Sequence, residues 1–156
     1  MILSQIKQNS WEHLGKSYDR FIAFGENSYF KSGKSIKTRV NHNLNIADIE
    51  EQINKNSHAK NVTYKGKYYE VGPLSRAMIR KTPLTKEVHR RYGDSIFSRI
   101  LARVCEIPQL LHHSKELLKK LDLDESSYIE PQIDISKITA CGVGVVEAAR
   151  GSLIHK

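Results

Sequence analysis

The sequence predicts an α+β fold that is mainly helical, and three patterns in its 156 residues support this prediction. First, apolar residues recur at seven-residue spacing between residues 97 and 118, which indicates a long amphipathic helix. Second, β-branched and aromatic residues flank a glycine near residues 62–71, which is typical of a β-hairpin. Third, β-branched residues return with glycines near 138–155, which indicates a C-terminal strand region. No repeat or linker divides the chain, so we expect residues 1–156 to form a single domain.

The N-terminal third gives weaker signals. Apolar residues from Leu3 to Ile22 have the spacing of one or two amphipathic helical pieces broken near Gly15. Residues 26–43 are polar and basic, which predicts a long loop with one short strand at SIKTRV. Asn45 has the character of an N-cap, and it predicts a short helix over IADIEEQINK.

Two short helices are expected after the hairpin, because each segment begins with a proline. Pro73 belongs in the first turn of PLSRAMIRK, and Pro83 precedes LTKEVHRRY, which Gly93 ends.

The longest helix is expected over residues 95–121, with Asp94 as its cap. Its continuous apolar stripe predicts burial in the core. Pro108 lies within the stripe, and we expect it to produce a kink or to divide the segment into two helices.

Composition narrows the classes of function. The chain has 25 basic and 17 acidic residues, a net charge of +8 that would attract nucleic acid, anionic lipid or an acidic partner. The basic residues are dispersed and lack interleaved aromatic side chains, so we expect solvated faces or subunit contacts and no nucleic-acid site. Neither a membrane-spanning run nor a secretory signal is evident, so we expect a cytoplasmic protein.

Few residues suggest chemistry by themselves. Cys105 and Cys141 have no further Cys or His at ligand spacing, so they predict unpaired thiols and no metal site, although a disulfide between them remains an alternative. Arg150 lies between Ala149 and Gly151, whose small size lets the backbone approach another group while the guanidinium presents a fixed fork of donors. An exposed turn arginine is the simpler alternative for this pattern.

Two longer motifs add to these observations. YEVGPLSRA at residues 69–77 resembles the Y-x-V-G-P-L-A-R motif of nickel-iron hydrogenase large subunits, and GVGVVEAARGSLIH at 142–155 resembles their G-x-G-x-x-E-A-P-R-G-x-L-x-H motif. With gaps, the resemblance extends over about residues 40–156. It implies an internal or C-terminal-half fragment of such a large subunit.

The resemblance also implies roles for individual residues. Arg150 matches the arginine that lies over the nickel-iron centre of the family and hydrogen-bonds the cyanide side of the iron, so it is the implied catalytic residue. An always-charged guanidinium suits contact with anionic ligands. The family's proline before this arginine is Ala149 here, and alanine is commoner where this chain has Ser75. The implied supporting residues are the remaining motif positions: Glu147, Ala149, Gly151, Gly72, Pro73 and Arg76.

The family's metal ligands have no match in this chain. The four cysteines belong to R-x-C-G-x-C and D-P-C-x-x-C motifs, which are both missing, and neither Cys105 nor Cys141 corresponds to a ligand. We therefore expect no metal or cofactor in this chain alone, and a nickel-iron centre only in the complete parent protein.

The resemblance implies a parent reaction, the reversible oxidation of dihydrogen to protons and electrons, and its implied partner is an iron-sulfur small subunit. Two alternatives stay open. The quinone-chamber subunit of respiratory complex I lacks the cysteines too, but it generally has lysine followed by an acidic residue where this chain has Arg150 and Gly151. A basic module that binds nucleic acid or an acidic partner is the second alternative.

Overall fold

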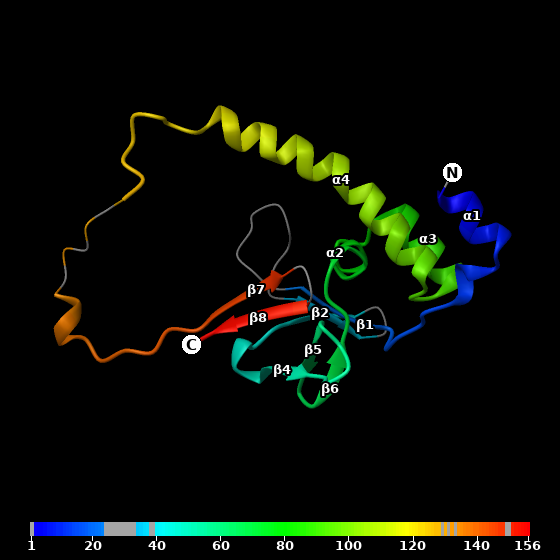
Figure 1. Cartoon of the computed structure of the whole chain (residues 1–156), viewed down its shortest axis with the longest axis horizontal. Coiled ribbons are helices and arrows are strands. Elements are labelled where there is room, and N and C mark those ends of the chain that lie inside the picture. The colour runs from blue at the N-terminus through cyan, green and yellow to red at the C-terminus, as the bar shows by residue number, and fades with distance from the viewer. Residues whose placement is uncertain are drawn as a thin grey trace.

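The computed structural model describes residues 2–23, 34–37, 40–128, 130, 132, 134–148 and 151–156, and it confirms the predicted α+β class (Figure 1). Its helices and 3-10 turns are α1 (Ile2–Gln8), η1 (Trp11–His13), η2 (Ile46–Asp48), α2 (Pro73–Ile79), α3 (Pro83–Tyr92), α4 (Ile96–Lys119) and η3 (Ile135–Lys137). Its strands are β1 (Arg20–Ala23), β2 (Lys34–Lys37), β3 (Val40–Asn43), β4 (Ile49–Ile53), β5 (Lys60–Tyr64), β6 (Lys67–Tyr69), β7 (Gly144–Ala148) and β8 (Gly151–His155).

The described strands form three small antiparallel sheets, in the orders β1-β2-β3, β4-β5-β6 and β7-β8. The first two sheets meet at an isolated parallel β-bridge between Phe21 of β1 and Glu70, the residue that follows β6. There the N–H of Ile22 donates to the Glu70 carbonyl at 3.0 Å, and the N–H of Glu70 donates to the Arg20 carbonyl at 2.8 Å. Strand β8 packs against β4 and β5, so the third sheet lies against the second.

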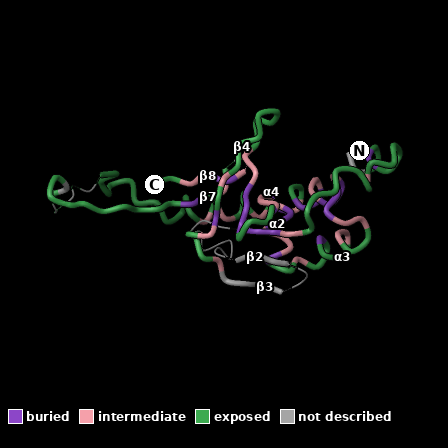
Figure 2. The backbone as a smooth tube through the Cα atoms, turned by 90° about the horizontal axis from the view of Figure 1, so that it is seen from below, coloured by how far each residue is buried: buried purple, intermediate pink, exposed green. Residues whose placement is uncertain are grey.

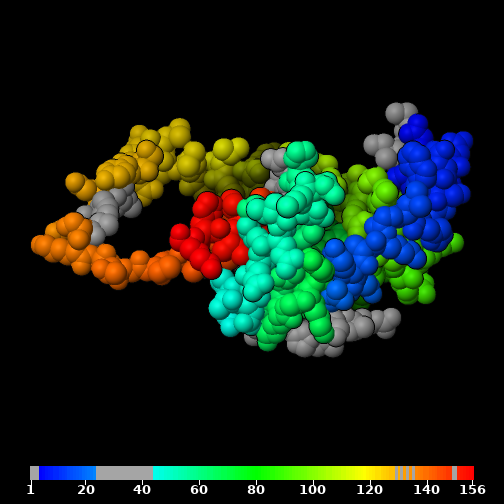
Figure 3. Space-filling model, turned by 60° about the horizontal axis from the view of Figure 1, so that its bottom comes forward, coloured from blue at the N-terminus to red at the C-terminus, as the bar shows by residue number. Residues whose placement is uncertain are grey.

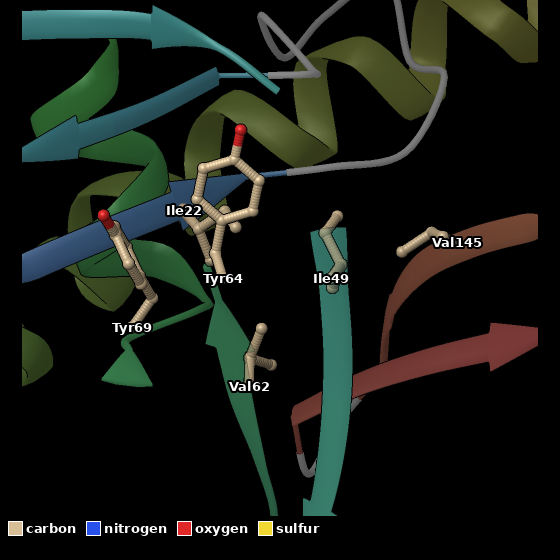
Figure 4. Packing of buried hydrophobic residues seen from close by; sticks show 6 residues of the cluster. All are labelled: Ile22, Ile49, Val62, Tyr64, Tyr69 and Val145. Carbon is tan, nitrogen blue, oxygen red and sulfur yellow. The ribbon is translucent and has the colours of Figure 1, made fainter. Parts of the chain in front are cut away.

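Strand β1 is buried on both of its faces. Successive side chains of a strand point to opposite sides, and here Ile22 and Phe21 enter two different apolar clusters. The Ile22 cluster lies among the strands and also contains Ile49, Val62, Tyr64, Tyr69 and Val145 (Figure 4). The Phe21 cluster lies on the helical side with Leu74 and Ala102. Strand β1 therefore separates the strand layer from the helices α2 and α4.

The buried hydroxyl of Ser75 joins β1 to the start of α2. Ser75 has no exposed surface, and its Oγ accepts from the Ile22 N–H at 2.9 Å and donates to the Glu70 carbonyl at 2.6 Å. A buried hydroxyl that lacked partners would be unfavourable, so these bonds stabilise the junction. The difference from the family's commoner alanine at this position thus has a structural explanation.

The Glu70 side chain links the same junction to α4. Arg99 donates to it through Nε at 2.7 Å and Nη2 at 2.9 Å, which is a bidentate ion pair. This hydrogen bonding raises the pKa of Arg99, although burial opposes the increase. Arg99 also contacts the carbonyl of Gly15, and so it brings the N-terminal segment to the same helix.

Two helical predictions for the N-terminal part are wrong. Phe21 and Ile22 belong to β1 rather than to a helix, because a short apolar run that is buried on both sides has no strand periodicity to reveal it. Asn45 does cap a helical turn, accepting from the Ala47 N–H at 3.2 Å, but the turn ends at Asp48 and the chain continues as β4. Burial of Ile49 and pairing with β5 outweigh the helical preference of this segment.

The predicted hairpin and the two proline-initiated helices are confirmed. The prediction of one short strand at SIKTRV is only partly right, because β2 ends at Lys37 and Val40 begins a second strand, β3, that pairs with β2, while residues 38 and 39 lie outside the described part. The hairpin is β5 and β6, which a turn at Lys65 and Gly66 joins. Helices α2 and α3 begin at Pro73 and Pro83, and Gly93 ends α3 with a φ of 69°.

Helix α4 is continuous through Pro108, so the prediction of two helices is wrong. Of the four residues at seven-residue spacing only Phe97 is buried, and Val104 is already 49% exposed. In the second half Leu111 and Leu118 are 67% and 70% exposed. The prediction that the whole stripe is buried is therefore also wrong, because within the described residues nothing covers this part of α4 (Figure 2).

The connection from α4 to β7 leaves the body of the molecule. In Figure 3 the orange segment before β7 stands clear of the rest of the chain. Every described side chain from Lys120 to Gly144 is exposed, including the large apolar Leu123 and Tyr128. No described helix has both the length and the apolar character that crossing a membrane requires.

The cap of α4 is Ser95 rather than the predicted Asp94. Ser95 accepts from the Ser98 N–H at 3.4 Å. Asp94, which is 4% exposed, instead accepts from the N–H and Oγ of Ser17 at 2.9 Å and from the N–H of Asp19 at 3.0 Å. Burial alone would raise the pKa of Asp94, but these hydrogen bonds lower it below its ordinary value. Asp94 therefore connects the N-terminal segment to the helices.

We predict that Asp94→Ala lowers the free energy of unfolding by about 2 kcal/mol at pH 7, since it removes hydrogen bonds to a charged acceptor. The lowered pKa of Asp94 means that this contribution is present above the carboxyl's unfolded pKa of about 4 and is lost as pH falls through the folded pKa. Urea unfolding between pH 7 and pH 3 measures both effects. The exposed Glu125→Gln is the control, and equal stability of Asp94→Ala and wild type would contradict the assignment.

The two halves of the α4 stripe should respond differently to truncation. Phe97→Ala removes a side chain that is 7% exposed and should cost about 3–5 kcal/mol. Leu111→Ala lies two heptads further along, is exposed, and should change stability by less than about 0.5 kcal/mol. Urea unfolding compares the two variants, and similar losses would show that the second half is covered in the isolated chain.

Candidate functional site

The first motif forms the start of α2 and places Arg76 one turn into the helix. Gly72 precedes the helix with a φ of 111°, a conformation that favours glycine, and Pro73 occupies the first turn. The N–H of Arg76 donates to the Gly72 carbonyl at 3.0 Å, which closes that turn. This local geometry directs the arginine side chain toward α4 and β7.

Arg76 forms a bidentate ion pair with Glu106 of α4. Its Nε lies 2.7 Å from Oε1 and its Nη2 lies 2.6 Å from Oε2. The two side chains are 17% and 11% exposed, so the pair is largely removed from water. Loss of one partner from a buried pair leaves an uncompensated charge, which typically costs about 3–5 kcal/mol.

The same guanidinium contacts the second motif. Nη1 of Arg76 donates to Glu147 of β7, whose side chain is 12% exposed. Burial alone would lower the pKa of Arg76, but the hydrogen bond to Glu106 and the charge of Glu147 outweigh it and raise the pKa. Two motifs that are distant in sequence therefore meet in one network of three side chains, Arg76, Glu106 and Glu147, which we call the Arg76 triad.

The second motif forms the hairpin β7-β8, in which Ala148 pairs with Gly151. Gly151 has a φ of 119°, and a Cβ at this position would overlap the Lys60 carbonyl of β5. Only glycine allows this close approach without strain. Gly151 therefore lets the hairpin lie directly on the second sheet.

The Glu51 carboxylate of β4 accepts hydrogen bonds from two residues of β8. Its Oε1 accepts from the Ile154 N–H at 2.7 Å and from Ser152 Oγ at 3.2 Å, and its Oε2 lies 2.7 Å from Lys60 Nζ. Burial would raise the pKa of Glu51, but the hydrogen bonds from Lys60, Ile154 and Ser152 lower it. The carboxylate thus stays ionised and joins the hairpin to β4.

The structure places most of the predicted site residues, but two of them lie outside the part that it describes. The structure brings Arg76 and Glu147 together, and it places Gly72 and Pro73 at the start of the helix that carries Arg76. Gly151 lies against β5. Ala149 and Arg150 connect the paired ends of β7 and β8 in the sequence but lie outside the described residues.

Sequence reasoning missed Glu106 and Glu51. Glu106 is the single acidic residue in the first fifteen positions of α4, and it follows the buried Ser98 and Ala102 at four-residue spacing. That spacing places all three on one helix face, and this was the available signal. Glu51 gave no such signal, because its segment was assigned to a helix.

The donor set of the described residues does not fit a metal. Among them no three His, Cys, Asp or Glu side chains lie close enough to hold an ion together. Cys105 is a half-buried free thiol on α4, and Cys141 is an exposed free thiol before β7. The predicted disulfide alternative is therefore not formed here.

Comparison with known proteins identifies the family. The model of the nickel-dependent hydrogenase family matches residues 19–156. The chain is 30% identical over 94 residues to an iron-sulfur subunit of the F420-non-reducing hydrogenase of Archaeoglobus profundus, covering 56% of this chain and 19% of that protein. It is 30% identical over 121 residues to a vhu subunit of the F420-non-reducing hydrogenase of Methanococcus voltae, covering 69% of this chain and 27% of that protein.

A solved structure has the same fold. The Ni-Fe-Se hydrogenase from D. vulgaris Hildenborough superposes with a TM-score of 0.71 at 18% identity, covering 99% of this chain and 42% of that one. This chain belongs to the nickel-dependent hydrogenase family. The match favours the hydrogenase interpretation over the complex I and nucleic-acid alternatives. The chain spans between 19% and 27% of the length of these two curated relatives.

We predict that Gly151→Ala lowers the free energy of unfolding by at least about 2 kcal/mol, because alanine is strained at this φ and its Cβ meets the Lys60 carbonyl. Gly142→Ala is the matched control in the same motif, since its Cβ would meet nothing within 4 Å. Urea unfolding measures both variants. Equal tolerance of the two substitutions would contradict the close approach of β8 and β5.

Proposed function

We propose that this chain is a single-domain portion of the catalytic large subunit of a nickel-iron hydrogenase. The parent reaction is the reversible oxidation of dihydrogen to two protons and two electrons. The observation that carries the proposal is the ion pair between Arg76 and Glu147, 71 residues apart, because it joins the two motifs that resemble the family's motifs. Membership of the nickel-dependent hydrogenase family supports it.

Arg150 is the proposed catalytic residue. It lies between Glu147, which contacts Arg76, and Gly151, which lies against β5, so the chain on both sides of it is held. A guanidinium remains charged at every physiological pH and offers donors in a fixed plane, which suits an anionic ligand. Its contribution is electrostatic stabilisation by an oriented donor.

The nickel-iron centre belongs to the complete large subunit in this proposal. The described residues supply no ligand set, so the metals and their ligands come from parts of the parent protein outside these residues. The exposed apolar side chains of the second half of α4 support a larger assembly, since such faces are usually covered by another element. The proposed partner is an iron-sulfur small subunit that takes up the electrons.

The proposed compartment is the cytoplasm. Cys105 and Cys141 are both free thiols, which agrees with a reducing environment. The proposal of a cytoplasmic compartment is the same whichever electron acceptor the parent enzyme uses.

The test uses the complete hydrogenase that contains this chain. We predict that Arg150→Lys lowers dihydrogen-dependent reduction of a viologen dye by about 100-fold or more, with unchanged nickel content, because lysine cannot reproduce the planar donor fork. Arg103→Lys, on the exposed part of α4, is the control and should keep wild-type activity. Activity of Arg150→Lys within about twofold of wild type would contradict the catalytic role.

A second measurement tests where the metal ligands lie. The purified 156-residue chain should contain substoichiometric nickel and iron by elemental analysis. About one nickel per chain would show that the chain has its own ligand set and would contradict the proposed division of the site. Cysteine motifs R-x-C-G-x-C upstream and D-P-C-x-x-C downstream in the same reading frame would identify the parent protein.

A further inference from the structure

A small cavity lies between the helices α2, α3 and α4, which pack against one another. It leaves a volume of about 10 Å³ for the centre of a water molecule. A cavity needs roughly 10–15 Å³, measured in this way, to hold one water. The space between the three helices therefore has the size of a single water molecule.

The hydroxyl of Thr85 provides a polar group at this cavity. Thr85 belongs to α3, lines the cavity and has no exposed surface. Among the described residues, its Oγ1 has no hydrogen-bond partner. Buried polar groups are almost always hydrogen-bonded, because an unsatisfied one is unfavourable. The hydroxyl thus requires a partner at the place where a water fits.

Glu106 of α4 lines the same cavity and offers a second partner. Each of its carboxylate oxygens accepts one bond from Arg76. A carboxylate oxygen has two lone pairs, so each retains the capacity to accept one more hydrogen. The Cys105 thiol also lines the cavity and adds a weak third partner. Buried waters typically make about three hydrogen bonds, and these groups are enough to supply them.

Two further lining residues form the rim of the cavity on its solvent side. Arg80 is exposed and Gln109 is half-buried, and Nη1 of Arg80 donates to Oε1 of Gln109 at 3.1 Å. Nε2 of Gln109 donates to the Cys105 carbonyl at 3.0 Å, which fixes the amide against α4. This hydrogen-bonded rim separates the base of the cavity from bulk solvent.

We propose that the cavity binds one ordered water molecule, which accepts a hydrogen bond from Thr85 Oγ1 and donates one to Glu106. The water joins α3 to the Arg76 triad, whose ion pairs connect α2, α4 and β7. This inference goes beyond the proposed function and does not depend on it, because every group in it belongs to the described helices.

Replacement of Thr85 by valine distinguishes a bound water from an unsatisfied hydroxyl. Thr85→Val keeps the shape of the side chain and removes only the hydroxyl. Removal of a hydroxyl that has no partner would be neutral or stabilising. Removal of one that holds a water leaves buried acceptors and the water without a partner, so the unfolding equilibrium constant should rise by about tenfold. Urea unfolding of the full chain measures this change.

Thr63→Val is the matched control. Thr63 is 2% exposed, and its Oγ1 also has no hydrogen-bond partner within the described part of the chain, but it does not line this cavity. Its replacement should leave the unfolding equilibrium constant within about twofold of wild type or lower it. The two valine variants are therefore expected to differ in the sign or size of their effect.

A crystal structure of the wild-type chain observes the water directly and does not require that any variant folds. Electron density for a water about 3 Å from both Thr85 Oγ1 and a Glu106 oxygen is expected. Thr85→Ser retains the hydroxyl and should retain the water.

Three results would overturn the proposal. The first is a high-resolution structure of the wild-type chain without this water. The second is a Thr85→Val chain that is at least as stable as wild type. The third is an equal loss of stability in Thr85→Val and Thr63→Val, since an effect shared with Thr63 does not come from this cavity. None of these measurements requires hydrogenase activity, so they leave the proposed function to its own test.

Discussion

The seven residues from Glu70 to Arg76 are the constraint on which the other layers depend. Glu70 binds β1 through its backbone and α4 through its carboxylate. Ser75 adds a second bond to β1, and Arg76 reaches α4 and β7. These groups are polar and mostly buried, so each position has few alternative partners. Directional bonds of this kind specify the relative placement of elements more narrowly than apolar contact does.

The sequence predicted the elements whose signals are local. Pro73 and Pro83 mark helix starts and Gly93 marks a helix end because each residue type restricts the backbone directly. Strands β1 and β4 were mistaken for helices because their identity depends on what packs against them. Ile22 and Ile49 meet in one cluster although they are distant in sequence, and no local pattern contains that information. The second half of α4 is exposed for the same reason. Periodicity predicts that a helix has an apolar face, but it does not show whether another element packs against that face.

For the candidate site, the sequence predicted the residues of the two motifs but not the contacts between them. Recognition of two motifs predicted Arg76 and Glu147, but only the structure shows that they touch each other. Glu106 lies outside both motifs and has the appearance of an ordinary polar residue on an amphipathic helix. An ion pair between distant segments depends on tertiary placement, and a lone carboxylate in a sequence gives no indication of its partner. Arg150 remains a prediction from the motif, since it lies outside the described residues.

The connection between α4 and β7 has a consequence for how the molecule is assembled. Its described side chains are all exposed, so the covalent path contributes little to where the hairpin lies. Glu51, Lys60 and Arg76 determine that position instead. The entropy of closing such a loop changes slowly with its length, by only about 0.6 kcal/mol for each doubling. Insertions, deletions or even a cut in this connection are therefore compatible with the same site. The hairpin β7-β8 is held by its own contacts with the second sheet and Arg76, and the connection only keeps it close to them.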